Sequence, residues 1–140
     1  MTAFVLDCSI AVTWCFDDEA SDEADALLDR LQEQGAAVPS LFPLELGNIL
    51  ALAERRGRIP ASGLLPRLEL IASLPIEVDP NTAAMALRET LTLARRHALT
   101  TYDASYLELA LRKGAALATR DKALVLAAQR TGVMLLLQPT

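Results

Sequence analysis

The chain has 140 residues and a net charge of −5, and it is 52% hydrophobic but only 4% aromatic. This length predicts one domain with a sizeable core built from Leu, Ala, Val and Ile side chains. No apolar run approaches the roughly 20 residues of a membrane-spanning helix, and the N-terminal residues lack the features of a secretory signal, so we expect a cytoplasmic protein without membrane contact. Cys8 and Cys15 fit neither a zinc nor a redox spacing, so we expect two reduced, packed thiols.

Acidic residues are distributed unevenly along the chain. Eight of the 18 acids lie between Asp17 and Glu33, where Arg30 is the one base. The rest of the chain is therefore slightly basic. The negative net charge does not exclude an anionic substrate.

The first part of the chain predicts a strand, a helix and a second strand. Residues 2–7, TAFVLD, form a short β-branched and aromatic run that is typical of a buried strand. The segment 17–35 has leucines at helical spacing, acids in its first turn and a glycine at its end, which predicts a helix. Residues 36–39 form a minimal second strand. We assign no element to residues 8–16.

The middle of the chain predicts three helices and one strand. Residues 40–57 place Leu, Ile and Ala side chains on one stripe of a helix. A second helix is expected over 61–74, with a late start or a kink at Pro66. Residues 75–79 form a third strand, and 81–99 a long amphipathic helix.

The last part predicts a helix over 99–114, a strand over 115–119, a helix over 121–132 and a strand over 133–137. Strands that alternate with helices of this length favour parallel pairing in a sheet covered on both faces. No repeat, low-complexity tract or linker interrupts the pattern. The sequence therefore predicts a single α/β domain.

Four acidic side chains are predicted to meet at one edge of this sheet. In open parallel sheets, ligands bind beyond the carboxyl ends of the strands. Asp7 ends the first strand, Asp121 follows the fourth, and Asp103 begins the helix that leads into the fourth. Glu45 is the lone acid of an apolar stretch after the second strand. Each alone suits a helix cap or a solvated side chain, but together they would repel one another unless a cation neutralised them.

The chemical types of these residues indicate a hard divalent cation. Mg²⁺ and Mn²⁺ prefer carboxylate oxygen and water, and the chain has one histidine and no cysteine cluster that would favour zinc. Such a site suits phosphodiester hydrolysis, in which Asp7, Asp103 and Asp121 would hold the ion. Glu45 would share the ion or position the attacking water.

Three polar residues are predicted to support the acids: Ser9, Asn48 and Thr119. Asn48 follows Glu45 by three residues, so its amide lies on the same face of the helix. The two hydroxyls lie two residues from Asp7 and Asp121. A simple cap or strand-end role is an equally good interpretation of both hydroxyls.

Four segments carry a family resemblance. They are VLDCSIAV with its Asp-x-Ser (5–12), PSLFPLELGNIL with Glu followed by Asn (39–50), LTTYDASYLELA (99–110) and LATRDKAL (117–124). Together and in this order they resemble the PIN-domain ribonucleases, and most closely the VapC toxins of bacterial toxin–antitoxin pairs. The resemblance extends from Ala3 to Pro139.

This resemblance implies a three-layer α/β/α fold with a central parallel sheet of four to five strands, formed by residues 1–140 as one PIN domain. It implies a Mg²⁺- or Mn²⁺-dependent endoribonuclease that acts as a toxin. By position, it assigns the metal site to Asp7, Glu45, Asp103 and Asp121, with support from the three polar residues above. At Arg120 the chain departs from the apolar residue that is frequent in the family.

The implied partners are an RNA substrate and an antitoxin protein. Possible RNA contacts are Arg95, Arg96, Arg120 and Lys122, with Arg55, Arg56 and Arg58 as further candidates, although charged residues at helix ends are usually solvated. The apolar composition predicts a homodimer through the helices between Leu41 and Leu74. His97 is expected at a helix C-terminus, and Trp14 in the core or at a partner contact.

Three alternatives remain open at this point. The first is a PIN nuclease of RNA processing without an antitoxin, which the neighbouring reading frame would distinguish. The second is a module that binds metal and RNA but does not cleave. The third is a phosphoacceptor receiver domain, which expects paired acids after the first strand and a lysine after the last; neither is present here.

Overall fold

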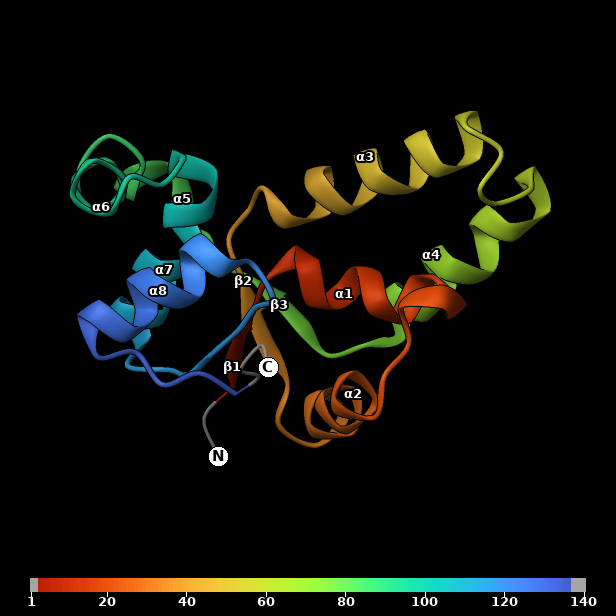
Figure 1. Ribbon diagram of the computed structural model, residues 1–140, viewed down its shortest axis with the longest axis horizontal. Helices are drawn as coiled ribbons and strands as arrows, with labels where there is room; N and C mark the ends of the chain where they lie inside the picture. Colours follow the sequence, from red (N-terminus) through yellow and green to blue (C-terminus); the bar gives the residue numbers. More distant parts are fainter. Residues whose placement is uncertain (1–2, 137–140) are drawn as a thin grey trace.

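A parallel sheet of four short strands lies at the centre of the molecule, a computed structural model that describes residues 3–136 (Figure 1). Its strands are β1 (Phe4–Leu6), β2 (Ala36–Val38), β3 (Ile76–Val78) and β4 (Leu117–Ala118), in the order β3-β2-β1-β4. All three pairings are parallel. The parallel sheet predicted from the alternation of elements is therefore confirmed.

Of the predicted fifth strand, 133–137, the described residues 133–136 form a single parallel bridge, between Leu135 and Leu117. Residue 137 lies outside the described residues, as does the first residue of the predicted strand 2–7. The central strands supply the core, since Val5, Leu6 and Val38 are completely buried. Their burial on both faces matches the continuous apolar runs of these short strands.

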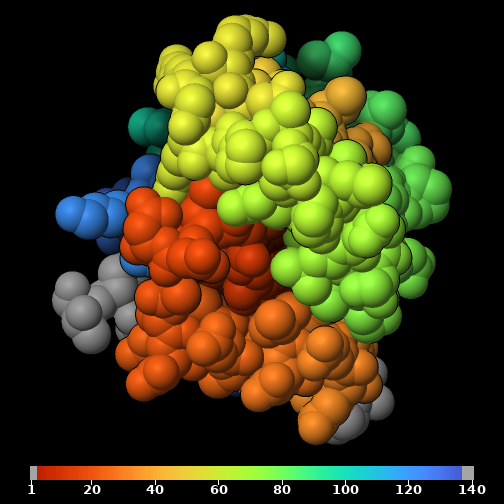
Figure 2. All heavy atoms as spheres, turned by 90° about the vertical axis from the view of Figure 1, so that its right-hand side faces the viewer, coloured from red at the N-terminus to blue at the C-terminus, as the bar shows by residue number. Residues whose placement is uncertain are grey.

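Helices cover both faces of the sheet and form the outer two of three layers (Figure 1). One face carries α1 (Cys8–Cys15), α2 (Asp22–Gln34), α3 (Phe42–Arg55) and α4 (Leu64–Ser73). The other face carries α5 (Thr82–Met85), α6 (Glu89–His97), α7 (Thr101–Lys113) and α8 (Lys122–Thr131). Figure 2 views the first face, where α2, α3 and α4 surround α1. The three-layer α/β/α fold is confirmed.

Two helical segments differ from the sequence predictions. Helix α1 occupies residues 8–15, to which no element was assigned, and its buried Ile10 and Ala11 pack into the core. The single helix expected over 81–99 is broken, because Arg88 has φ −118° and ψ −110°, outside the helical region. No proline or glycine lies at this break, so the sequence pattern did not predict it.

The other helices agree with prediction apart from their ends. A 3₁₀ turn, Asp17–Glu19, precedes α2, so the predicted helix 17–35 begins late. Another, Ala61–Gly63, precedes α4, which starts at Leu64 and keeps Pro66 in its first turn. This is the late start that the proline predicted. Within residues 3–136, no helix is long and apolar enough to span a bilayer.

Candidate active site

Asp7 lies where β1 ends and α1 begins, and it is only 5% exposed. Its Oδ2 accepts hydrogen bonds from the Ser9 hydroxyl at 2.6 Å and from the Thr119 hydroxyl at 2.7 Å. Two hydroxyls therefore fix the orientation of this carboxylate. Ser9 and Thr119, both singled out in the sequence, contact the same oxygen of the same acid.

The same two hydroxyls connect the end of β1 to the loop after β4. The backbone N–H of Arg120 donates to Ser9 Oγ at 2.9 Å, and that of Asp121 donates to Thr119 Oγ1 at 3.1 Å. Asp121 is also the N-cap of α8, where its Oδ1 accepts from the Leu124 N–H at 3.0 Å. This network holds Asp7 and Asp121 in fixed positions at the carboxyl edge of the sheet.

Asp103 lies in the first turn of α7, half-buried. The N-cap of this helix is Thr100, whose hydroxyl accepts from the Asp103 N–H at 3.0 Å. Thr100 thus fills the cap position, and Asp103 lies three residues later, inside the first turn of the helix. A capping role does not account for Asp103.

Glu45 lies in the first turn of α3, on the other helical layer, and is half-buried. Its Oε1 accepts a hydrogen bond of 2.5 Å from the hydroxyl of Tyr106, which is fully buried on α7. The acid predicted after the second strand is therefore bound to the helix that carries Asp103. Asn48, one turn further along α3, is exposed and makes no side-chain hydrogen bond within residues 3–136.

Electrostatic coupling shows that the four acids share one neighbourhood. Burial is the main cause that raises the pKa of Asp7, of Glu45 and of Asp103 above the usual range. The charge of Asp121 raises the pKa of Asp7 and of Asp103 further. The charges of Asp7 and Asp103 act in the same direction on the pKa of Glu45. The charges of these four acids therefore act on one another, and their assignment to one metal site stays a prediction.

No lysine or arginine of the described chain, 3–136, forms an ion pair with any of the four acids. In that same range, no three side chains of the His, Cys, Asp and Glu types stand close enough to form a ready-made metal cage. The carboxylates fit Mg²⁺ or Mn²⁺ by donor type and by their need for positive charge. Mg²⁺ usually takes one or two carboxylates and completes its shell with water and substrate phosphate, so a complete cage is not required.

The predicted basic residues lie on the surface. Arg95 and Arg96 are exposed in the last turn of α6, and Arg120 and Lys122 are exposed on either side of Asp121. Arg58, a further candidate, is paired with Asp18 at 3.0 Å and Glu19 at 2.7 Å. It also lies 3.7 Å from the ring centroid of Phe16. These contacts give Arg58 a structural role in the α1 layer.

The structure also gives the positions of the single histidine, the single tryptophan and the two cysteines. His97 is the last residue of α6, as predicted. Trp14 is half-buried and donates from Nε1 to the Ala24 carbonyl at 2.8 Å. Cys8 and Cys15 are free and buried. Burial raises the pKa of Cys8 to about 12, so this thiol stays protonated beside the acids and is a poor metal ligand.

Sequence reasoning missed Tyr106. Its place in an oily helix suggested a core side chain, and its ring is indeed buried. A buried tyrosine hydroxyl nevertheless needs a polar partner, and the acids predicted nearby are the natural acceptors. That requirement was the one feature of the sequence that could have connected Tyr106 to the site.

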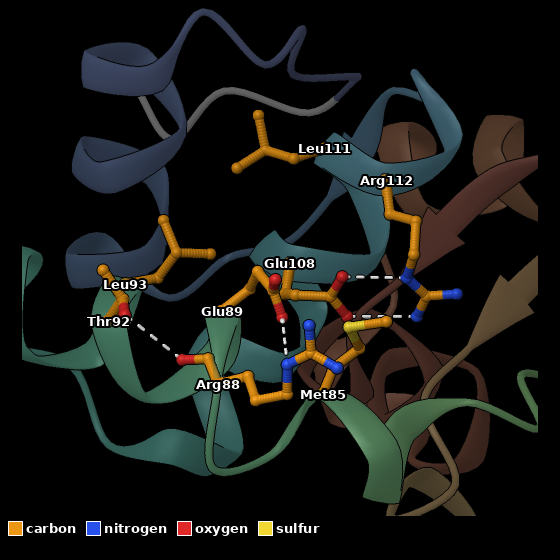
Figure 3. Close-up of a pocket in the computed structure, with 8 residues that line it drawn as sticks. All are labelled: Met85, Arg88, Glu89, Thr92, Leu93, Glu108, Leu111 and Arg112. Carbon is orange, nitrogen blue, oxygen red and sulfur yellow. Dashed lines mark hydrogen bonds and ion pairs between the residues drawn. The ribbon is translucent and has the colours of Figure 1, made fainter.

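A pocket of about 670 Å³ lies away from the four acids, between α5, α6 and α7 (Figure 3). Its lining includes Met85, Leu93 and Leu111, together with the ion-paired Glu108 and Arg112. None of the four acids lines this pocket. The chemistry of the molecule is therefore expected at the sheet edge and not in this hollow.

Comparisons with known proteins agree with this geometry. The model of the PIN domain family matches residues 4–129. Ribonuclease VapC3 of Pyrobaculum aerophilum is 31% identical over 124 residues, which cover 86% of this chain and 90% of that protein.

Solved structures share the fold. PAE2754 from Pyrobaculum aerophilum superposes with a TM-score of 0.70 and 25% identity, covering 96% of this chain and 84% of that chain. VapBC2 from Rickettsia felis, solved bound to a DNA fragment from its promoter, gives a TM-score of 0.67 and 16% identity, covering 96% of this chain and 97% of that chain. At that identity the second likeness concerns the fold alone.

Proposed function

The chain belongs to the PIN domain family, and from this premise we propose that it is a divalent-metal-dependent endoribonuclease, the toxin of a toxin–antitoxin pair. The observation that carries the proposal is the cluster of four carboxylates, which come from distant segments and lack a basic partner among the described residues. The likeness to a named ribonuclease over most of its length supports RNA as the substrate.

Asp7, Asp103 and Asp121 would hold the ion, Mg²⁺ or Mn²⁺, and Glu45 would share it or orient the attacking water. When bound, such an ion supplies positive charge to the phosphate oxygens and lowers the pKa of the attacking water. Ser9 and Thr119 contribute by fixing the Asp7 carboxylate, so that little reorganisation is needed when the substrate binds. The RNA backbone would be attracted by the exposed bases Arg95, Arg96, Arg120 and Lys122.

The experiment is an RNA cleavage assay with Mg²⁺ or Mn²⁺, with EDTA, and with the Asp7→Asn variant. A bound metal is worth several kcal/mol in the transition state, so Asp7→Asn should lower the rate by at least about 100-fold. Asp29→Asn makes the same charge change at an exposed position on α2 and should cleave as the wild type does. Cleavage that survives both EDTA and Asp7→Asn would refute the proposal.

The antitoxin is proposed from the kinship with a VapC ribonuclease. A toxin of this kind should be encoded beside a small partner protein. Co-expression with the product of the neighbouring reading frame should yield a stable complex in which RNA cleavage is suppressed. If that product neither binds nor inhibits, the chain acts without an antitoxin, as an RNA-processing nuclease would.

A homodimer through α3 and α4 is the remaining part of the proposal. Leu44 on α3 is 78% exposed and Leu65 on α4 is 62% exposed, which supports a contact on this surface. Light scattering should give about twice the chain mass of 15.1 kDa, and Leu44→Glu should shift the protein toward the monomer. A wild-type protein that stays monomeric would contradict this part alone.

A further inference from the structure

Tyr106 connects the buried core of α7 to the acid on α3. Its side chain is completely buried, and its hydroxyl donates to Glu45 Oε1 at 2.5 Å. Glu45 lies on α3 and Tyr106 on α7, and these helices belong to opposite layers (Figure 1). The bond therefore joins the two helical layers at the sheet edge. Within residues 3–136, Glu45 Oε2 accepts no hydrogen bond.

The Tyr106 hydroxyl can serve only as the donor in this pair. A carboxylate oxygen has no proton to donate, so the phenol O–H of Tyr106 donates and Glu45 Oε1 accepts. The bond therefore fixes one carboxylate oxygen of Glu45 and leaves the second oxygen for another ligand. A short O–H···O⁻ bond of this kind is charge-assisted and strong.

We propose that Tyr106 is a positioning residue of the nuclease site: it holds Oε1 of Glu45 so that Oε2 is presented to the divalent ion bound by the other acids. The inference rests on the proposed function and extends it to a residue outside the four carboxylates. Tyr106 acts through Glu45 and does not itself touch the ion or the RNA.

The placement of Tyr106 on α7 strengthens the inference. Tyr106 follows Asp103 by three residues, so the two side chains lie on the same face of the helix. Helix α7 thus supplies one acid directly and orients a second acid from the opposite layer. A displacement of α7 would disturb both acids together.

The test is the Tyr106→Phe variant, which keeps the ring in the core and removes the hydroxyl alone. Its matched control is Tyr102→Phe on the same helix, where the side chain is 65% exposed. Mn²⁺ affinity is measured by calorimetry without RNA, and kcat and KM by RNA cleavage. Tyr106→Phe should weaken Mn²⁺ binding about 10- to 100-fold and lower kcat with KM for RNA unchanged. Tyr102→Phe should match the wild type in Mn²⁺ affinity.

A double-variant cycle distinguishes positioning from general packing. Adding Tyr106→Phe to Glu45→Gln should weaken Mn²⁺ binding no further, because Glu45 is already altered. An equal loss in both backgrounds would overturn the inference, as would wild-type affinity in Tyr106→Phe. If the wild-type protein itself neither binds Mn²⁺ nor cleaves RNA, the proposed function falls along with the inference.

A spectroscopic measurement tests the inference in a protein that keeps the Tyr106 hydroxyl. The chain has two tyrosines, so Tyr102→Phe leaves Tyr106 as the sole source of tyrosine Raman bands. Those bands respond to the hydrogen bond of the phenol hydroxyl. They should report a phenol that donates a hydrogen bond both before Mn²⁺ is added and at Mn²⁺ saturation, because Tyr106 keeps Oε1 of Glu45 while Oε2 takes the ion. Loss of this hydrogen bond when Mn²⁺ binds would overturn the inference.

Discussion

Asp7 combines burial with negative charge and has no basic partner within residues 3–136. Its two hydroxyl donors compensate part of the lost hydration, yet burial still raises its pKa. A carboxyl group with a raised pKa in the folded state lowers stability as pH rises through that pKa, because the unfolded chain ionises more easily. In the absence of a cation, the site is therefore a source of instability at neutral pH.

The Asp7→Asn variant should separate stability from activity. Because the substitution removes a desolvated charge, the metal-free variant should unfold at neutral pH at a temperature no lower than the wild type, although RNA cleavage is lost. Thermal unfolding followed by circular dichroism in EDTA measures this. A marked fall in melting temperature would show that the carboxylate stabilises the fold and would argue against a site that awaits a cation.

Divalent ions should stabilise the wild type through the same carboxylates. Mn²⁺ at about 100 times its Kd should add roughly 2.7 kcal/mol to the free energy of unfolding by mass action. Asp7→Asn should lose most of this gain, whereas the surface variant Asp29→Asn should keep it. Thermal shifts over a Mn²⁺ series provide the measurement, and equal shifts in all three proteins would place the ion elsewhere.

At the scale of elements, the sequence predicted the sheet better than the connections around it. Apolar runs such as 36–39 predicted buried strands correctly, because a strand that is buried on both faces of a sheet consists of consecutive apolar residues. Helix α1 escaped prediction because Ile10, Val12 and Thr13 favour extended structure locally, and tertiary burial overrides that preference. The break at Arg88 has no local marker, so only the packing of α6 could reveal it.

The grouping of the acids was predictable for a simple geometrical reason. Parallel strands end at the same sheet edge, so Asp7 and Asp121 had to lie near each other once the strands were identified. The role of Tyr106 was not predictable in that way. Its bond to Glu45 depends on how far apart α3 and α7 lie, and no sequence spacing reports that distance.

The N-cap of α7 offers a test at this scale. Thr100→Ala removes the acceptor of the Asp103 N–H and should cost about 1 kcal/mol of stability. Ser21→Ala removes the equivalent cap of α2, where Ser21 accepts from the Ala24 N–H at 3.1 Å, and should cost a similar amount. Because the first turn of α7 carries an acid of the site, cleavage should fall in Thr100→Ala and not in Ser21→Ala. Equal activity in the two variants, measured well below their melting temperatures, would contradict this.

At the scale of the whole molecule, one buried ion cluster ties the end of β3 to α7. Arg112 donates to Asp79 at 2.6 and 3.0 Å and to Glu108 at 2.8 and 3.0 Å, and both acids are almost fully buried. Figure 3 shows the Arg112 and Glu108 part of this cluster beside the pocket. Removing the arginine would leave two buried carboxylates without a counter-charge.

The Arg112→Met variant should therefore lower the free energy of unfolding by about 3 to 5 kcal/mol. Arg130→Met, at an exposed position in the last turn of α8, should change it by no more than about 0.5 kcal/mol. Urea denaturation gives both values. A loss in Arg112→Met as small as that of the control would show that the cluster contributes little to the fold.

The same cluster predicts part of the pH dependence of stability. The hydrogen bond to Arg112 is the main cause that lowers the pKa of Asp79 below its ordinary value of 3.8. Its stabilising effect is complete above that value and is lost as pH falls through the lowered pKa of the folded state. Urea denaturation below pH 3.8 should show a steeper loss of stability for the wild type than for Asp79→Asn. Parallel curves would contradict the assignment.

The central claim is that carboxylates from four distant segments hold one divalent ion, and a crystal soaked in Mn²⁺ tests it most directly. Anomalous scattering should place the ion at the carboxyl edge of the sheet, in contact with oxygens of Asp7, Asp103 and Asp121. An ion bound elsewhere, or a fully soaked crystal with no ion at this edge, would contradict the account.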